Sequence, residues 1–340
     1  MSEDLRALQA ANDVLEALAI DQGERVDIYD ALDKCGLFLT FDSLQGVLGV
    51  SLPKLGGVMV TTQRRNAIQR FTAAHELGHC ILHSNELMII DDEALILHAS
   101  LVDQERQAQL FASAFLMPSE LALSVADRYN IQSGLAAPPA VGRAARDMGV
   151  SYEATARRLV QLNRLTPTDQ DELMLGRPRW RREELFGIRP ARNTLDVWGV
   201  RASTASLNLT VALGDQITIL FPENRTTGYH WILDEEANPG TDGAVAIVGD
   251  EFRLSRSANS ESVVVGQQGE RLISLQAVSA GPLVIEWRLA RPFDPSGSVV
   301  DYRATFEILP SPADQRVGQI LSTPLDETST VQYLRLGGGE

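Results

Sequence analysis

Hydrophobic residues in the first half of the chain recur three or four positions apart, which is the spacing of an α-helix that buries one face. They predict helices over residues 5–18, 26–36 and 102–117 and a helical pair over residues 138–165. Two runs rich in β-branched and aromatic residues, 37–41 and 57–62, instead predict short strands. The first half is therefore expected to combine helices with a small sheet.

After a connector at residues 176–200, the hydrophobic period changes from that of a helix to that of a strand. Apolar and polar residues alternate in four runs, Leu207–Leu213, Ile217–Phe221, Leu283–Leu289 and Tyr302–Ile308. Short alternating strands separated by turn residues are typical of an all-β, immunoglobulin-like sandwich. Residues 311–340 are polar and close with Gly-Gly-Gly-Glu, so we expect a partly mobile tail.

Length and composition favour a multidomain α+β protein. The chain has 340 residues, of which 44% are hydrophobic, and a formal net charge of -15. That charge argues against broad, non-specific affinity for nucleic acid. The sequence has only two cysteines, no evident signal peptide and no run of about 18 apolar residues. We therefore expect a cytoplasmic protein with no membrane partner.

The most informative stretch is Thr72–His83, which contains His-Glu-x-x-His and three of the five histidines of the chain. On a helix, His75 and His79 lie on one face, one turn apart, so both imidazoles can bind one metal ion. Zinc is the usual occupant of such a pair. Glu76 lies beside them and can take a proton from an attacking water. The spacing predicts a metallopeptidase.

A catalytic zinc usually has three protein ligands. The motif extension with a third histidine is excluded, because Leu82 and Asn85 occupy the positions that it requires. A following helix, residues 102–117, offers two carboxylates. Glu105 shares the apolar face of that helix, whereas Asp103 does not, so Glu105 is the predicted ligand. We expect His83 to lie too far along its helix to reach the same ion.

The helical pair over residues 138–165 contains the pattern Ala-x-x-x-Gly-Val-Ser from Ala145 to Ser151, which resembles the turn of a helix-turn-helix. Ser151 is expected to cap the second helix. The segment carries five arginines against two acidic residues. Because many helical hairpins share this turn, DNA contact is only an alternative hypothesis.

Three blocks in the first half, Arg70–His79, Glu105–Ala112 and Leu116–Pro118, occur in order and resemble the ImmA/IrrE metallopeptidase family. The resemblance covers about residues 1–165. It implies a zincin-like core in which His75, His79 and Glu105 bind zinc and Glu76 is the catalytic base. It also implies a DNA-bound repressor as substrate, in stress-response or mobile-element switching.

Residues of the second half resemble the chagasin family of cysteine-peptidase inhibitors, over about residues 200–310. The resemblance is carried by Asn224–Trp231, Gly266–Gly269 and Arg291–Phe293. It implies an immunoglobulin-like sandwich whose three loops bind a papain-like cysteine peptidase. The implied partner-binding residues are Thr226, Thr227, Gly228, Gly266, Gly269, Arg291, Pro292 and Phe293. Each loop departs once from the family pattern, at Arg225 for Pro, Gln268 for Gly and Phe293 for Trp, so poor inhibition is expected.

The predicted organisation has five parts: a zinc metallopeptidase core at 1–125, a helix-turn-helix-like segment at 126–175, a linker at 176–200, a chagasin-like sandwich at 201–310 and a tail at 311–340. The preferred function is zinc-dependent hydrolysis of a peptide bond in a protein substrate, a transcriptional repressor by the family resemblance. The alternatives are a non-enzymatic sensor or cysteine-peptidase inhibitor with a structural zinc, and a DNA-binding regulator. Glu76 favours the enzyme, because a structural zinc needs no base.

Overall fold

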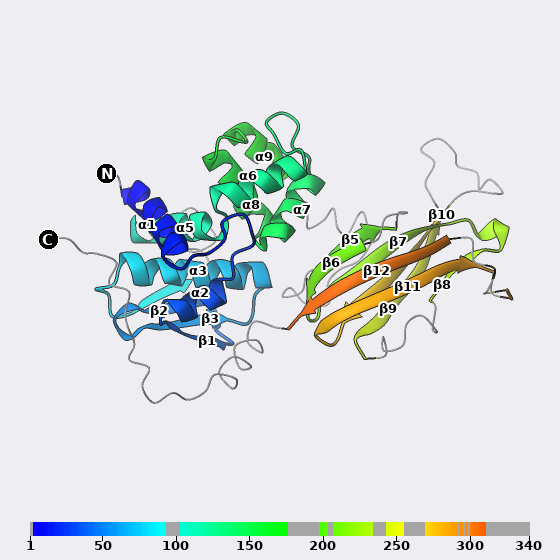
Figure 1. Cartoon of the computed structure of the whole chain (residues 1–340), viewed down its shortest axis with the longest axis horizontal. Coiled ribbons are helices and arrows are strands. Elements are labelled where there is room, and N and C mark those ends of the chain that lie inside the picture. The colour runs from blue at the N-terminus through cyan, green and yellow to red at the C-terminus, as the bar shows by residue number, and fades with distance from the viewer. Residues whose placement is uncertain are drawn as a thin grey trace. The chain divides into compact units, whose positions relative to one another are not determined.

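We describe a computed structural model of the chain, which is of mixed α+β architecture (Figure 1). The residues that the structure describes are 3–92, 103–175, 197–202, 207–233, 243–254, 269–291, 293–294, 297 and 300–310. They belong to two compact units, one within Met1–Pro178 and the other within Arg179–Ser311. Among these residues, no single helix is long and apolar enough to cross a membrane.

The first unit contains a four-stranded sheet in the order β1-β3-β2-β4. Its strands are β1 (Phe38–Asp42), β2 (Val47–Leu52), β3 (Gly57–Thr61) and β4 (Ile89–Asp92), with a 3-10 turn, η1 (Pro53–Leu55), between β2 and β3. β1 and β3 are parallel, while β2 is antiparallel to both β3 and β4. The short strands before residue 75 thus form part of a sheet, as their composition predicts.

The helices of this unit are α1 (Glu3–Ala17), α2 (Ile28–Lys34), α3 (Asn66–Leu82), α5 (Asp103–Leu116), α6 (Ser119–Arg128), α7 (Pro138–Met148), α8 (Tyr152–Gln161) and α9 (Pro167–Leu175). α3 is the central one, because it packs against β2 and β3 of the sheet and against α5. Its residues Thr72–Cys80 are all buried. The His-Glu-x-x-His stretch therefore lies inside this unit.

The second unit consists of two four-stranded sheets, ordered β5-β7-β10-β9 and β6-β12-β11-β8 (Figure 1). The strands are β5 (Val197–Arg201), β6 (Leu207–Ala212), β7 (Gln216–Glu223), β8 (His230–Leu233), β9 (Val245–Leu254), β10 (Gly269–Ala277), β11 (Gly281–Ala290) and β12 (Val300–Leu309), with a 3-10 turn, η2 (Arg225–Thr227). Alternate residues of both sheets share one core, in which the ring of Phe221 contacts those of Trp231, Trp287 and Tyr302. This shared core makes the unit a β-sandwich.

One boundary differs from the sequence analysis. Residues 197–200, placed in the linker by composition, form β5 together with Arg201 and pair in parallel with β7. The strand escapes detection because it is short and is extended only by pairing with a strand later in the chain. The rest of the predicted linker, residues 176–196, and the predicted tail, 311–340, lie outside the described residues.

Candidate metal centre and loop edge

The two motif histidines face each other from successive turns of α3. Their Nε2 atoms are 3.0 Å apart, and both side chains are fully buried. The helix dictates this approach, because residues four apart lie one above the other on the same face. His75 and His79 thus direct two nitrogen atoms toward one point.

Glu105 directs its carboxylate to the same point from α5. Its Oε2 is 3.2 Å from His75 Nε2, and its Oε1 is 3.5 Å from His79 Nε2. Tetrahedral zinc with bonds of about 2.0–2.1 Å separates its ligand atoms by about 3.3 Å. The three observed distances bracket that value, so the donor set fits a zinc ion. Among the residues that the structure describes, this is the one group of three His, Cys, Asp or Glu side chains close enough to hold a metal.

The two residues weighed as alternative ligands lie elsewhere. Asp103 has a side chain that is 71% exposed and pairs with Arg106 on the surface. His83 follows the last residue of α3, and its ring centroid is 5.4 Å from that of His79. Partial burial lowers the pKa of His83, which favours the neutral ring. Neither residue belongs to the cluster of possible ligands.

Glu76 is directed toward the sheet rather than into the ligand cluster. It is fully buried and lies against the backbone of β2 at Gly49. A Cβ atom at Gly49 would be 2.0 Å from Glu76 Oε1 and 2.6 Å from the methyl group of Thr72. Only glycine leaves room for the carboxylate at this point. The sequence analysis missed Gly49, although a glycine inside an apolar strand can signal close approach of another group.

A second glycine brings the ligand-bearing helices together. A Cβ atom at Gly78 of α3 would be 3.1 Å from the ring of Phe111 and 3.3 Å from the Cα of Ala108, both on α5. Helices approach this closely only where a small residue lies between them. The absence of a side chain at Gly78 therefore helps to bring Glu105 within reach of the two histidines.

The free cysteines offer no reactive thiolate near this cluster. Burial raises the pKa of the Cys80 thiol to about 12 and that of the Cys35 thiol to about 11. Both thiols are protonated at neutral pH and behave as small apolar side chains. Cys80 therefore adds no acid–base group to His75, Glu76 and His79 on α3.

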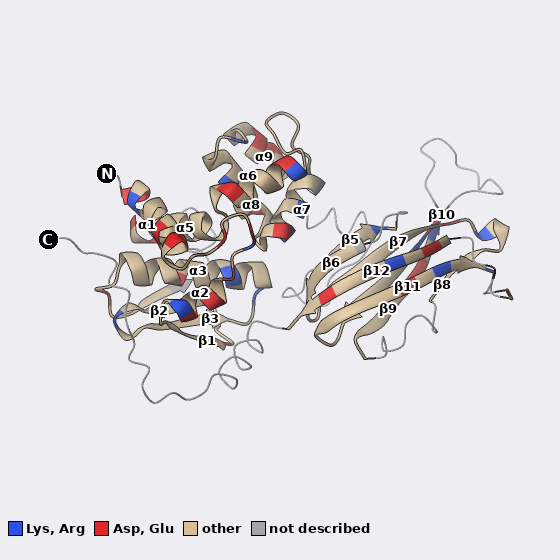
Figure 2. Ribbon diagram, viewed as in Figure 1, with Lys and Arg blue, Asp and Glu red and all other residues tan. Residues whose placement is uncertain are grey.

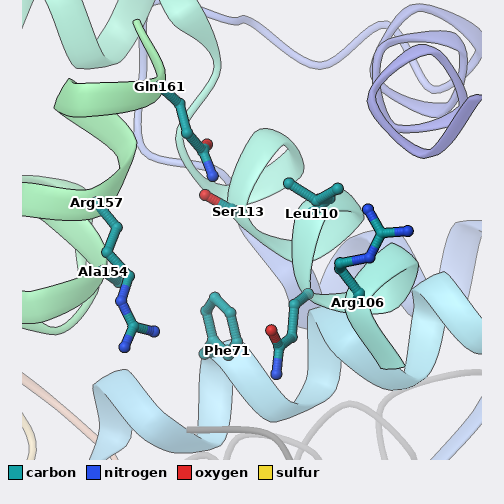
Figure 3. A pocket seen from close by; sticks show the side chains of 8 residues that line it. Phe71, Arg106, Leu110, Ser113, Ala154, Arg157 and Gln161 are labelled. Carbon is teal, nitrogen blue, oxygen red and sulfur yellow. The ribbon is translucent and has the colours of Figure 1, made fainter. Parts of the chain in front are cut away.

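A cavity of about 180 Å³ lies between α3, α5 and α8 (Figure 3). Phe71, one helical turn before His75, forms part of its wall, and Ser113 and Gln161 point toward each other across it. Two arginines also line it, but Arg106 pairs with Asp4 and Asp103, and Arg157 pairs with Glu153. The lining is therefore mixed, without a dominant charge.

The helical pair predicted over residues 138–165 is present as α7 and α8. Gly149 makes the turn with φ +67°, and Ser151 caps α8 by accepting a hydrogen bond from the Ala154 N–H at 3.1 Å. Arg158 is buried and donates to the Met117 carbonyl oxygen. One face of α8 is packed into the unit, through Thr155, Ala156, Arg158 and Leu159, while its other residues are partly or fully exposed.

Three of the five arginines of this hairpin, Arg143, Arg158 and Arg164, contact other parts of the same unit. Arg164 donates to the carbonyl oxygen of Ile131 and pairs with Asp127. Figure 2 shows acidic and basic residues mixed along α6 to α9. The hairpin thus offers no continuous basic face, and DNA contact receives no support from it.

In the second unit, the first of the matched loops is a short, capped turn. Asn224 Oδ1 accepts hydrogen bonds from the N–H and the hydroxyl of Thr226, and Gly228 ends η2 with φ +75°. Thr226 and Thr227 are exposed. The turn therefore displays two small side chains on a backbone that is internally hydrogen-bonded.

The third matched loop lies beside the first. The guanidinium of Arg291 is 4.8 Å from the ring centroid of Tyr229 and 5.9 Å from that of Phe293, whose side chain is 80% exposed. Gly269, from the second loop, is buried, whereas Gly266 and Pro292 lie outside the described residues. The structure thus brings Thr226, Thr227, Gly228, Arg291 and Phe293 to one edge, and places Gly269 beneath it.

Comparison with known families assigns both units. Residues 51–160 match a peptidase family described as the IrrE N-terminal-like domain. Residues 210–308 match the chagasin family of peptidase inhibitors. Both resemblances drawn from the sequence are confirmed. The chain joins a metallopeptidase-like domain to a chagasin-like domain.

Similar solved structures include a cysteine protease inhibitor from Entamoeba histolytica, which is 21% identical and matches over 34% of this chain and 96% of that chain, with a TM-score of 0.29. The inhibitor PbICP-C, solved in complex with falcipain-2, is 15% identical over 34% of this chain and 98% of that chain, with a TM-score of 0.23. A Mycobacterium tuberculosis transcriptional regulator is 12% identical over 81% of this chain and 76% of that chain, with a TM-score of 0.32. No curated protein matches the chain. At such TM-scores, the family matches alone identify the two domains.

Proposed function

We propose that this chain, built from an IrrE N-terminal-like domain and a chagasin-family domain, is a zinc-dependent endopeptidase with a second, protein-binding domain. The observation that carries the first half of the proposal is the spacing of three buried ligand atoms, 3.0–3.5 Å apart, from His75, His79 and Glu105. This spacing suits zinc. The first domain then has a zincin-like core, in which α3 carries both histidines.

His75, His79 and Glu105 would hold the ion, and Glu76 would act beside it. When bound, zinc would polarise the scissile carbonyl and lower the pKa of a water molecule. Glu76 would accept the proton of the attacking water and pass it to the amine nitrogen that leaves when the C–N bond breaks. Gly49 leaves space for its carboxylate.

The proposal is tested with the full chain and a fluorescence-quenched peptide library. Chelation should abolish cleavage, and stoichiometric zinc should restore it, because the ligand set fits this ion. Activity that survives complete removal of metal would contradict a zinc peptidase. A zinc-loaded chain that cuts no library peptide should be tested against a protein substrate, since endopeptidases can require a folded partner.

The specific substrate that the family resemblance suggests is a DNA-bound repressor. Co-expression of the chain with candidate repressors, followed by mass spectrometry of the fragments, tests this. A defined cut in the repressor that needs Glu76 supports it. If the enzyme cuts library peptides but leaves every candidate repressor intact, the hypothesis that a repressor is the substrate is contradicted. The proposal that the chain is a peptidase is then unaffected.

The second domain would bind a protein through its exposed loop edge. Support comes from three separate features: two exposed threonines on a capped turn, the exposed Phe293, and Arg291 between Tyr229 and Phe293. Loops carried at one edge of a rigid sandwich commonly form binding surfaces. A papain-like cysteine peptidase is the partner class that the chagasin match suggests, and titration of papain with the full chain tests it.

A further inference from the structure

A buried carboxylate lies at the base of the first loop. Glu223 has a side chain with no exposed surface, and its Oε2 accepts a hydrogen bond from the Trp231 N–H at 3.0 Å. Its Oε1 lies 3.1 Å from Nδ1 of His230 and 3.4 Å from Nε of Arg225. Arg225 lies in the turn between β7 and β8, and His230 and Trp231 are the first two residues of β8. Glu223 therefore connects the start of the first loop with its end.

Arg225 has a second partner on a different strand. Its guanidinium carbon is 4.0 Å from the ring centroid of Phe252 on β9. A guanidinium over an aromatic ring is attracted by the ring's negative face, and the aliphatic stem of the arginine adds packing. The Arg225 side chain is thus held between a buried carboxylate and an aromatic ring, although half of it is exposed.

The same ring covers the end of the second loop. A Cβ atom at Gly269 would be 2.2 Å from the tip of the Phe252 ring and 2.7 Å from the carbonyl oxygen of Arg253. Gly269 also pairs directly with Glu223 across the β7–β10 ladder. One aromatic ring therefore contacts a residue of the first loop and a residue of the second.

We propose that Arg225 and Phe252 are positioning residues, which hold the first loop in a single arrangement relative to Gly269, with Glu223 as the buried anchor of Arg225. The inference deepens the proposed protein-binding role and rests on it. A loop that is ordered before binding loses less conformational entropy when it binds. Arg225 thereby supplies by side-chain contacts the stiffness that a proline would supply covalently.

The backbone allows a direct comparison with proline. Arg225 is the first residue of η2, and Asn224 before it is extended, with φ -113° and ψ 98°. Proline is tolerated at the first position of a helical turn and favours an extended residue before it. Arg225→Pro should therefore keep the turn while removing the contact with Phe252.

The test measures amide hydrogen exchange of the full chain, by mass spectrometry of peptides that cover residues 224–229, without any partner. Phe252→Leu keeps an apolar side chain but removes the ring face. In the wild-type background, Phe252→Leu should speed exchange of the Thr226–Gly228 amides about tenfold. In the Arg225→Pro chain the same substitution should change exchange less than about twofold, because proline then restricts the turn itself.

The matched control is Arg253→Ala, which removes an exposed arginine next to Phe252 and should leave loop exchange unchanged. Amides of Leu272–Leu275 in the core report whether each variant stays folded. If Phe252→Leu loosens that core, Arg225→Gln, which removes the half-exposed guanidinium and leaves Phe252 in place, should still speed loop exchange. Equal acceleration in both backgrounds, or none in either, would overturn the inference. The exchange measurement uses no partner protein. A failure of the chain to bind papain would therefore contradict only the proposed binding role, and not the positioning role of Arg225 and Phe252.

Discussion

The backbone of Gly49 lies directly against the carboxylate of Glu76, so that a Cβ atom there would be 2.0 Å from Oε1. The relationship joins the sheet to the motif helix at the residue that we propose as the base. A methyl group added at position 49 should therefore disturb Glu76 and the Thr72 methyl group, 2.6 Å away, whereas no atom of His75, His79 or Glu105 is among its three nearest neighbours.

Gly49→Ala should lower kcat about 100-fold while zinc content stays at the wild-type level. The added methyl must displace the carboxylate, and a misplacement of about 1 Å can cost this much. Gly57→Ala, on the neighbouring strand, is the matched control, because the nearest atoms to its Cβ belong to the flexible side chain of Leu52 at 3.3 Å. If Gly49→Ala cleaves at the wild-type rate, the position of the Glu76 carboxylate does not matter for the reaction, which would contradict its role as the base.

Glu76→Gln should retain zinc and lose cleavage by about 10²–10⁴-fold. Glutamine keeps the size and shape of the side chain but cannot accept a proton. Steady-state kinetics together with metal analysis of the same preparation check the prediction. Loss of zinc in parallel with activity would instead make Glu76 a support of the metal site, and activity near wild type would exclude it as the base.

The β-sandwich should lose part of its stability in acid through Asp250. Arg271 donates hydrogen bonds to this carboxylate at 2.7 and 2.5 Å, and they lower its pKa. A carboxylate with a lowered folded-state pKa stabilises the fold above its unfolded pKa of about 3.9, and that contribution disappears as the pH falls through the folded value.

Since Asp250 is 43% exposed, solvent screening limits the effect to about 0.5 kcal/mol. Denaturant unfolding, followed through the buried Trp231 and Trp287, should show a smaller loss between pH 5 and about 3 in Asp250→Asn than in wild type. Glu251→Gln, at an exposed pair with Arg253, should not alter the profile. An identical acid response in Asp250→Asn would show that the ion pair contributes nothing.

Phe293→Trp should tighten binding of papain about fivefold relative to the wild-type chain, which we expect to inhibit papain poorly. Phe293 is 80% exposed on the loop edge, and the larger indole adds about 1 kcal/mol of apolar burial if it contacts the partner. Phe38→Trp, at an exposed aromatic of the first unit, is the control. Tight inhibition by the wild-type chain would favour the inhibitor hypothesis, and equal affinities would place Phe293 outside the contact.

Local patterns predict the parts of this protein that depend on one element at a time. Helical spacing indicates α1, α3 and α5, and it places Glu105 rather than Asp103 on a buried face. Alternation indicates β6, β7, β11 and β12, whose core side chains face one way. In each case the period of the element determines which side chains are buried.

The features that the patterns miss depend on pairing between distant segments. β9 was not predicted because Gly249, Asp250 and Glu251 interrupt its alternation. Phe252 and Gly269 come together only through the register of β9 on β10. Likewise, a glycine within the apolar residues 47–52 can signal that some group approaches closely, but only the packing of β2 on α3 shows that this group is Glu76. Register and packing are tertiary properties, and a single sequence does not display them.

The zinc content of two variants of α5 tests the central claim most directly. Glu105 lies 3.2 and 3.5 Å from the two histidine nitrogens, whereas Asp103, two residues earlier, is exposed and pairs with Arg106. After loading with zinc and removal of excess metal, wild type and Asp103→Ala should each hold about one zinc per chain, and Glu105→Ala should hold much less, because a site with two ligands is weak. Equal zinc in both variants, or none in the wild type, would contradict a zinc site built from His75, His79 and Glu105.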